Sequence, residues 1–184
     1  MEKYKILGVD PGTNILGYGL LEVEGKNVKL ITMGVIKLSH YPDHQTKLKE
    51  IYLQLQEIIE TYLPKTLAVE APFFGKNVQS MLKLGRAQGV SMAAAITMGL
   101  EIVEYTPKEI KKSITGNGNA SKEQVAAMLS SILNSKMESK YLDATDGLAA
   151  AYTYFNKSNS PLKGQKSYSG WSSFIKDNPK KLSK

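Results

Sequence analysis

The feature that most constrains this chain is a short apolar run, residues 6–9, that ends at Asp10 and a Pro-Gly turn. Four residues are too few for a helix, so the run predicts a buried strand with Asp10 at its C-terminal edge. Open sheets place their chemistry at this edge. A carboxylate close to a glycine suits a divalent cation bound beside a phosphate, because hard cations prefer oxygen ligands. The alternative is a strand that ends in an ordinary Asp-Pro-Gly turn.

The next segments predict further strands and a helix. Residues 15–23 and 28–38 are apolar and are separated by a loop that contains glycine, which predicts a hairpin. Apolar residues then recur at helical spacing over residues 46–62. A short apolar strand over residues 66–69 follows, and it ends on Glu70. The pattern seen at Asp10 therefore occurs twice.

The second half of the chain is mainly helical. A long helix is expected over residues 77–100 and a strand over residues 102–105. Capping-box patterns open two shorter helices, one after Thr106 and one at Ser121. A last helix is expected over residues 142–155. This order predicts an α/β protein with a five-stranded mixed sheet flanked by helices.

Composition divides the chain into a folded domain, residues 1–156, and a basic, Ser/Lys-rich tail, residues 157–184, which we expect to be flexible. The net charge is +7, but the tail holds seven lysines and one acid, so the domain itself is nearly neutral. Net charge is thus weak evidence for nucleic-acid binding by the domain. There is no cysteine and only two histidines, which excludes a thiolate or histidine metal cluster.

The start of the chain leads directly into the first strand. No long apolar segment precedes it, which argues against a signal peptide or a membrane anchor. We therefore expect a cytoplasmic protein that has no membrane partner.

Two more acids open the last helix. Asp143 and Asp146 are three residues apart, so they project from one face of its first turn. They could cap the helix, or they could join Asp10 and Glu70 at the strand ends. Four converging carboxylates repel one another, and divalent cations would stabilise them. The chain therefore predicts a carboxylate metal site that suits Mg²⁺ better than Zn²⁺.

Four ordered segments carry a resemblance to a known family. They are GVDPGT at 8–13, VEAPFF at 69–74, LKLGRAQGV at 82–90 and DATDGLA at 143–149. In this order and spacing they resemble the RuvC family of Holliday junction resolvases, over about residues 4–155. The resemblance implies a ribonuclease H-like fold and a homodimer. It also implies symmetric nicking of four-way DNA junctions during recombination and repair, and a branch-migration helicase complex as partner.

The resemblance also implies a catalytic centre. It carries the family's catalytic and metal-binding acids onto Asp10, Glu70, Asp143 and Asp146. Two Mg²⁺ ions per site, with Mn²⁺ able to substitute, would support attack by water on a phosphodiester. Asp10 would bridge the ions, Glu70 would complete one shell and orient the water, and the other two acids would hold the second ion.

Several side chains are candidates for DNA contacts. The resemblance places a base-stacking aromatic at Phe73, beside Phe74, and basic residues that flank the active site at Lys111 and Lys122. A stretch without acidic residues contains Lys76, Lys83 and Arg86, which could contact backbone phosphates of DNA. Asn77 could add a polar contact there. The ordinary interpretation is a pair of core phenylalanines and a set of solvated lysines.

The small residues of the long helix, Gly85, Gly89 and residues 93–95, could pack across a dimer or only onto their own sheet.

Other functions remain possible from the sequence. The first motif also resembles the phosphate loop of actin-like and Hsp70-like ATPases, but the chain lacks their second phosphate-binding half. A ribosomal-RNA-processing nuclease of the same fold and a non-catalytic junction-binding protein are the two alternatives. The presence of all four acids argues against the non-catalytic one.

Overall fold

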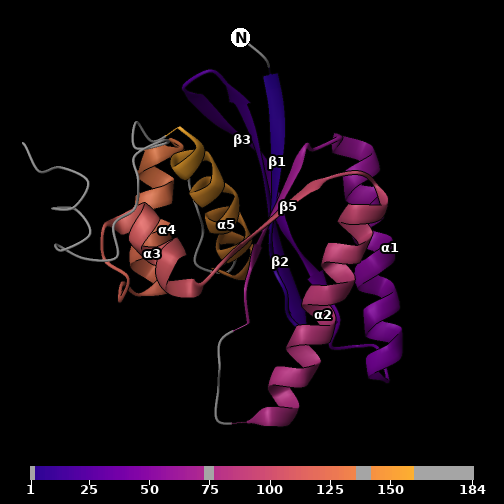
Figure 1. The fold of residues 1–184 in the computed structure, drawn as a ribbon. Coiled ribbons are helices and arrows are strands. Elements are labelled where there is room, and N and C mark those ends of the chain that lie inside the picture. The colour runs from indigo at the N-terminus through magenta and orange to yellow at the C-terminus, as the bar shows by residue number, and fades with distance from the viewer. Residues whose placement is uncertain (1–2, 73–76, 136–141, 160–184) are drawn as a thin grey trace, which may run out of the picture.

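A central sheet separates two groups of helices in the computed structural model, which describes residues 3–72, 77–135 and 142–159 (Figure 1). The five strands lie in the order β3-β2-β1-β4-β5. β1 pairs antiparallel with β2, and β2 with β3, whereas β4 runs parallel to both β1 and β5. The predicted five-stranded mixed sheet is confirmed, with β1 (Lys3–Asp10), β2 (Ile15–Glu24), β3 (Asn27–Lys37), β4 (Thr66–Glu70) and β5 (Glu101–Tyr105).

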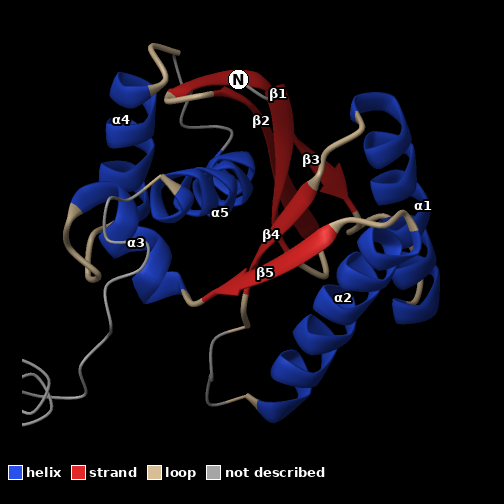
Figure 2. Cartoon of the chain, turned by 45° about the horizontal axis from the view of Figure 1, so that its top comes forward, coloured by secondary structure: helices blue, strands red, loops and turns tan. Residues whose placement is uncertain are grey.

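The helices cover both faces of this sheet, as Figure 2 shows. On one face lie α1 (His44–Tyr62) and α2 (Val78–Thr97), and on the other lie α3 (Pro107–Thr115), α4 (Lys122–Ile132) and α5 (Leu142–Ser158). Successive residues of a strand point to opposite faces. Ile6 accordingly belongs to the apolar core beneath α3–α5, and Leu7 to the core beneath α1 and α2.

Most helix starts match their sequence signals, whereas α2 ends at Thr97, three residues before the predicted end at residue 100. Both predicted capping boxes form, at Thr106 with Glu109 and at Ser121 with Gln124. The last helix is longer than predicted, because it ends at Ser158 rather than at residue 155. The final turn therefore includes Lys157, which the sequence assigned to the tail. The rest of that predicted tail, residues 160–184, lies outside the described residues.

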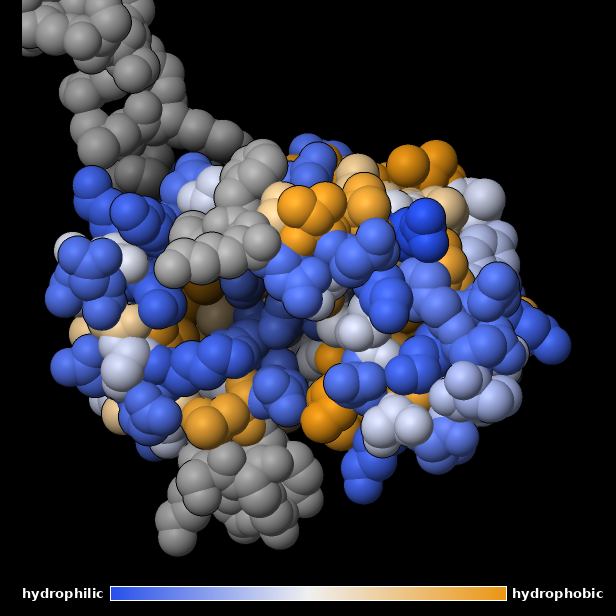
Figure 3. Space-filling view, turned by 90° about the horizontal axis from the view of Figure 1, so that it is seen from below, coloured by the Kyte–Doolittle hydropathy of each residue, from blue (hydrophilic) through white to orange (hydrophobic). Residues whose placement is uncertain are grey.

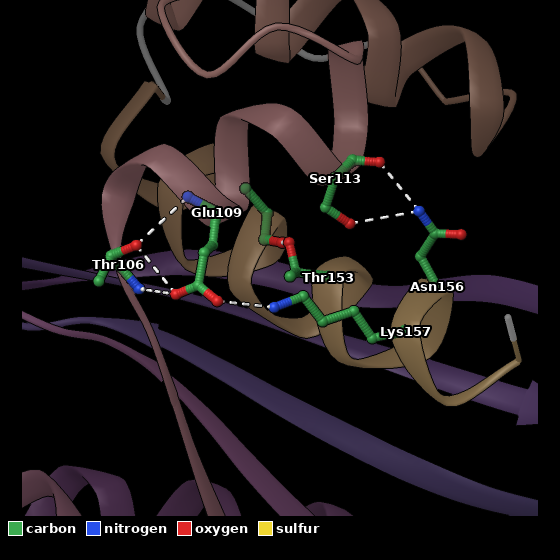
Figure 4. A network of polar contacts seen from close by, with 7 residues as sticks. Thr106, Glu109, Ser113, Thr153, Asn156 and Lys157 are labelled. Carbon is green, nitrogen blue, oxygen red and sulfur yellow. Dashed lines mark hydrogen bonds and ion pairs between the residues drawn. The ribbon is translucent and has the colours of Figure 1, made fainter. Parts of the chain in front are cut away.

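Contacts with α3 explain the longer helix (Figure 4). The side-chain amide of Asn156 donates to the carbonyl oxygen of Ser113 at 2.9 Å. The ammonium group of Lys157 forms an ion pair with Glu109 at 2.9 Å, and it lies 4.5 Å from the centre of the Tyr105 ring. Since Glu109 belongs to the capping box of α3, these contacts join the start of α3 to the end of α5.

Glycines allow α5 to approach β1 and β2 very closely. A Cβ atom on Gly8 would lie 2.1 Å from the carbonyl oxygen of Gly147, and one on Gly17 would lie 1.8 Å from that of Asp143. A Cβ atom on Gly147 would in turn lie 2.6 Å from the carbonyl oxygen of Gly17. The main chain of α5 therefore rests directly on the sheet, and this contact sets the first turn of α5 beside the end of β1.

Among the described helices, none has the length and the apolar character that crossing a membrane would require.

Candidate active site

Three of the four predicted acids line one cavity. β1 and β4 are parallel neighbours in which Val9 is opposite Val69, so Asp10 and Glu70 emerge side by side at the same edge of the sheet. The first turns of α5 cross this edge and add Asp146. Together the three carboxylates line a cavity of about 60 Å³. Its other walls come from α3, α4 and α5, through Pro107, Ile110, Lys111, Lys122, Val125 and Ala149.

The charges of these acids act on one another. Burial raises the pKa of Asp10 to about 7, and the neighbouring charges of Asp146 and Asp143 contribute in the same direction. Burial likewise raises the pKa of Glu70 to about 8, with further contributions from Asp10 and Asp146. The pKa of Asp146 is also raised, mainly by burial. Such a cluster is unfavourable while it is ionised and lacks a neutralising cation.

Asp143 and Asp146 differ in their positions. Asp146 faces the cavity, whereas Asp143 does not line it and acts on Asp10 and Asp146 through its charge. The capping interpretation does not account for Asp146, because its carboxylate forms an ion pair with Lys122 of α4.

Two of the predicted lysines reach the same cavity. Lys122, the first residue of α4, donates a hydrogen bond to Asp146. Lys111 of α3 lines the cavity, and its charge acts against the raised pKa values of Glu70 and Asp146. The cavity thus combines carboxylates with two ammonium groups, a combination suited to an anionic substrate held beside cations.

The donor set fits a hard divalent cation, since carboxylate oxygens are the ligands that Mg²⁺ prefers. Burial and mutual repulsion of the acids favour such a cation further. Within the described ranges, however, no three acidic, histidine or cysteine side chains are already grouped closely enough to hold a metal ion. The side chains would have to close around the ion.

A second cavity, of about 280 Å³, extends from the acids toward α2. Asp10 and Glu70 line it too, together with Leu84 of α2 and three residues of the adjoining loops, Pro11, Ala71 and Pro72. In Figure 3, which views the molecule from below, a hollow lies within a mostly hydrophilic surface. The two cavities extend from the acids in different directions, one toward α3 and α4 and one toward α2.

The remaining predicted DNA contacts are separate from the acids. Lys83 and Arg86 are exposed on α2 and do not line either of the two cavities. Asn77 caps α2, because its side-chain oxygen accepts from the backbone N–H of Ser80 at 3.1 Å. The other candidates, Phe73, Phe74 and Lys76, lie outside the described residues.

Sequence reasoning missed the walls of the acid cavity. Ile110 and Val125 are buried there, and both belong to the apolar faces of short helices. Their helical spacing could have marked them as buried, but nothing local shows that they would border the acids.

Comparisons with known proteins agree with the resemblance seen in the sequence. A family model described as "Crossover junction endodeoxyribonuclease RuvC" matches residues 6–154. A protein of that description from Christiangramia forsetii is 59% identical over 177 residues, which cover 96% of this chain and 92% of the relative. The relative from Bacteroides fragilis is 55% identical over 179 residues, covering 96% and 95%.

Solved structures are similar as well. Thermus thermophilus RuvC in complex with a Holliday junction substrate matches with a TM-score of 0.77 and 29% identity, covering 84% of this chain and 94% of that one. The yeast mitochondrial Holliday junction resolvase Ydc2 matches with a TM-score of 0.63 at 16% identity, covering 82% and 77%, which shows a shared fold.

Proposed function

Because the chain belongs to the RuvC family of crossover junction endodeoxyribonucleases, and so is an endonuclease that resolves Holliday junctions, we propose that the acid cluster at the ends of β1 and β4 is its catalytic centre. The supporting observation is the convergence of Asp10, Glu70 and Asp146 on one cavity with Lys111 and Lys122. The reaction is hydrolysis of a phosphodiester in recombination and repair. We further propose that the two strands are nicked symmetrically.

A nuclease of this family requires a divalent metal, and we propose Mg²⁺, two ions per site, with Mn²⁺ able to substitute. When bound, the ions would supply Lewis-acid stabilisation of the phosphate oxygens and would lower the pKa of the attacking water. Asp10 acts through its charge on Glu70 and is acted on by Asp143 and Asp146, and it would contact both ions. Glu70 would complete one shell and orient the water, while Asp143 and Asp146 would hold the other ion.

Lys111 and Lys122 have a complementary role in this proposal. Both side chains line the acid cavity, where the phosphate that is attacked would be bound. There they would stabilise the negative charge that develops on the phosphate oxygens. Lys122 now neutralises Asp146 through the ion pair, and it would turn to the substrate once that carboxylate has a metal ion.

DNA would be held mainly through its backbone. We propose phosphate contacts from Lys76, Lys83 and Arg86, with a polar contact from Asn77, because phosphate contacts position a duplex without reading its sequence. By similarity to the family, Phe73 would stack on a base at the crossover, with Phe74 beside it.

We propose that the active form is a homodimer that pairs through α2. One side of α2 is buried against α1 and the sheet through Ala87, Ala94 and Ala95. The opposite side exposes Val78, Leu82 and Ile96, which are 64%, 51% and 59% accessible. Between them, a Cβ atom on Gly85 or Gly89 would meet nothing within 4 Å. A two-fold contact along this stripe would match the two-fold symmetry of a junction.

On the basis of the family resemblance alone, we propose a branch-migration helicase complex as a partner. A cytoplasmic location is proposed because bacterial relatives match over most of this chain and the DNA substrate lies in that compartment.

A nuclease assay tests the proposed site. Wild type and Asp10→Asn would be incubated with Mg²⁺ and either a synthetic four-way junction, a linear duplex of the same sequence or a structured RNA. We expect paired nicks in the junction alone, and none with Asp10→Asn, although that variant still binds the junction. Cleavage of the RNA in preference to the junction would favour the ribosomal-RNA-processing alternative. Junction binding without cleavage by wild type would favour the non-catalytic one.

A further inference from the structure

Basic side chains from two helices gather near the loop that follows Asp10. Lys83 and Arg86 are exposed on α2, close in the sequence to Leu84, which lines the cavity that extends from the acids to α2. Across from them, the first turns of α1 contribute His44 and Lys47. The charges of Arg86, Lys83 and Lys47 all act on the His44 imidazole and, after burial, lower its pKa. The four side chains are therefore neighbours, although Lys83 follows His44 by 39 residues in the sequence.

The ammonium group of Lys47 is held in a fixed place. It donates to the side-chain oxygen of Asn14 at 3.1 Å. Asn14 lies in the loop that follows Asp10, and its carbonyl oxygen accepts from the backbone N–H of Leu38 at 2.8 Å. A lysine ammonium has three donors, so two remain for another acceptor. The loop that leads away from the catalytic Asp10 thus also positions Lys47.

Among the described residues, acidic side chains neutralise this cluster only in part. In the described part of the chain, no carboxylate forms an ion pair with Lys47, Lys83 or Arg86. The acid next to His44 is Asp43, whose carboxylate accepts from the backbone N–H and the hydroxyl of Thr46 at 2.7 and 2.8 Å. Asp43 is thus engaged in capping α1. Its carboxylate stays ionised beside His44, so the cluster sets the positive charges of Lys47, Lys83 and Arg86 against this one anion and remains positive overall.

We infer that Lys47, positioned by Asn14, contacts a backbone phosphate of the junction arm that leaves the active site over α1 and α2. This inference rests on the proposed function, in which Lys83 and Arg86 contact the same arm from α2. A positive surface formed by two helices and joined through Asn14 to the loop that follows Asp10 suits a polyanion that continues past the catalytic cavity. Lys47 would contribute to affinity and orientation, and not to sequence selectivity.

The test compares Lys47→Met with Lys49→Met in the full-length protein. Lys49 lies on the same helix two residues away, is exposed, and serves as the matched control. Binding to a fluorescent four-way junction would be measured by anisotropy with Ca²⁺ in place of Mg²⁺, over a series of salt concentrations. We expect Lys47→Met to lose up to about fivefold in affinity. Its slope of log affinity against log salt should become shallower by about one. Lys49→Met should match wild type.

Two further variants keep the test decisive. Lys47→Glu should weaken binding more than Lys47→Met, because it adds repulsion to the loss of a contact. Asn14→Ala combined with Lys47→Met should be no weaker than Lys47→Met alone, since Asn14 acts through Lys47. The inference is overturned if Lys47→Met and Lys49→Met, both folded by circular dichroism, give the same affinity and salt slope while wild type cleaves junctions. If wild type fails to cleave them, the proposed function is what fails.

Discussion

Replacing Asp10 with asparagine should stabilise the metal-free protein while it abolishes junction cleavage. Burial and the nearby acids raise the pKa of Asp10 from its ordinary 3.8 to about 7. Each pKa unit corresponds to about 1.4 kcal/mol, so keeping Asp10 ionised in the folded state at pH 8 costs about 4 kcal/mol. Asparagine has nearly the same shape and no charge. It should recover about 2–4 kcal/mol of that cost, because the amide also needs partners when it is buried.

The gain in stability from Asp10→Asn should depend on pH. A carboxyl group whose pKa is raised by folding destabilises the fold as pH rises from its ordinary pKa to the raised value. The difference in stability between Asp10→Asn and wild type should therefore grow by about 2–3 kcal/mol between pH 5 and pH 8, where it reaches its full size. In a domain of this size, the full difference corresponds to a Tm increase on the order of 10 °C.

The assay is thermal and urea unfolding in EDTA at pH 5, 6, 7 and 8. The control is Asp43→Asn, since asparagine also caps helices and the pKa of Asp43 is lowered rather than raised. No gain in stability with rising pH is expected for this control. Added Mg²⁺ should stabilise wild type far more than Asp10→Asn. An Asp10→Asn protein that is no more stable than wild type at pH 8 would refute the argument from buried charge. Retained cleavage would remove Asp10 from the catalytic centre.

Three further predictions follow from contacts of the described residues. Lys122→Met should slow junction cleavage on the order of a hundredfold, because Lys122 lines the acid cavity. Lys108 is exposed on the neighbouring helix α3, and Lys108→Met should cleave at the wild-type rate. Equal single-turnover rates for the two variants would contradict this prediction. Leu82→Glu should yield monomers in analytical ultracentrifugation. Leu53→Glu, which changes a similarly exposed leucine on α1, should leave the dimer intact. A dimeric Leu82→Glu protein would exclude the apolar stripe of α2 as the dimer interface. Lys157→Met should lower Tm slightly at neutral pH. The hydrogen bond from Lys157 is the main cause of the lowered pKa of Glu109, which is about 2. The difference in Tm between Lys157→Met and wild type should therefore vanish as acid protonates Glu109. A difference in Tm that stays constant down to pH 2 would indicate a packing effect instead.

Local signals predicted the elements of the fold well. The apolar runs that end on Asp10 and Glu70, the hairpin glycine and the two capping boxes each depend on residues close together in the sequence. The predicted end of α5 was wrong by three residues, because contacts with Ser113 and Glu109, more than forty residues away in the sequence, stabilise its last turn.

The acid cluster was predictable in part. Two strands that each end on an acid, and a helix that begins with two more, were sufficient to suggest that the carboxylates converge. The spacing could not show that Asp146 faces the cavity while Asp143 stands beside it, since this depends on how α5 rotates against the sheet. The contact of Lys47 with Asn14 spans 33 residues and has no local signature.

The glycine contact between α5 and the sheet has a consequence for metal choice. In an ordinary core, neighbouring side chains can shift when an atom is added or removed. At Gly8 and Gly147 the two main chains touch, so no side chain is available to adjust the distance between them. The gap between the acids of α5 and those of the strands is therefore set by the backbone. A variant that cleaves DNA with a larger ion such as Ca²⁺ would therefore have to be sought in this seam as well as among the carboxylates themselves.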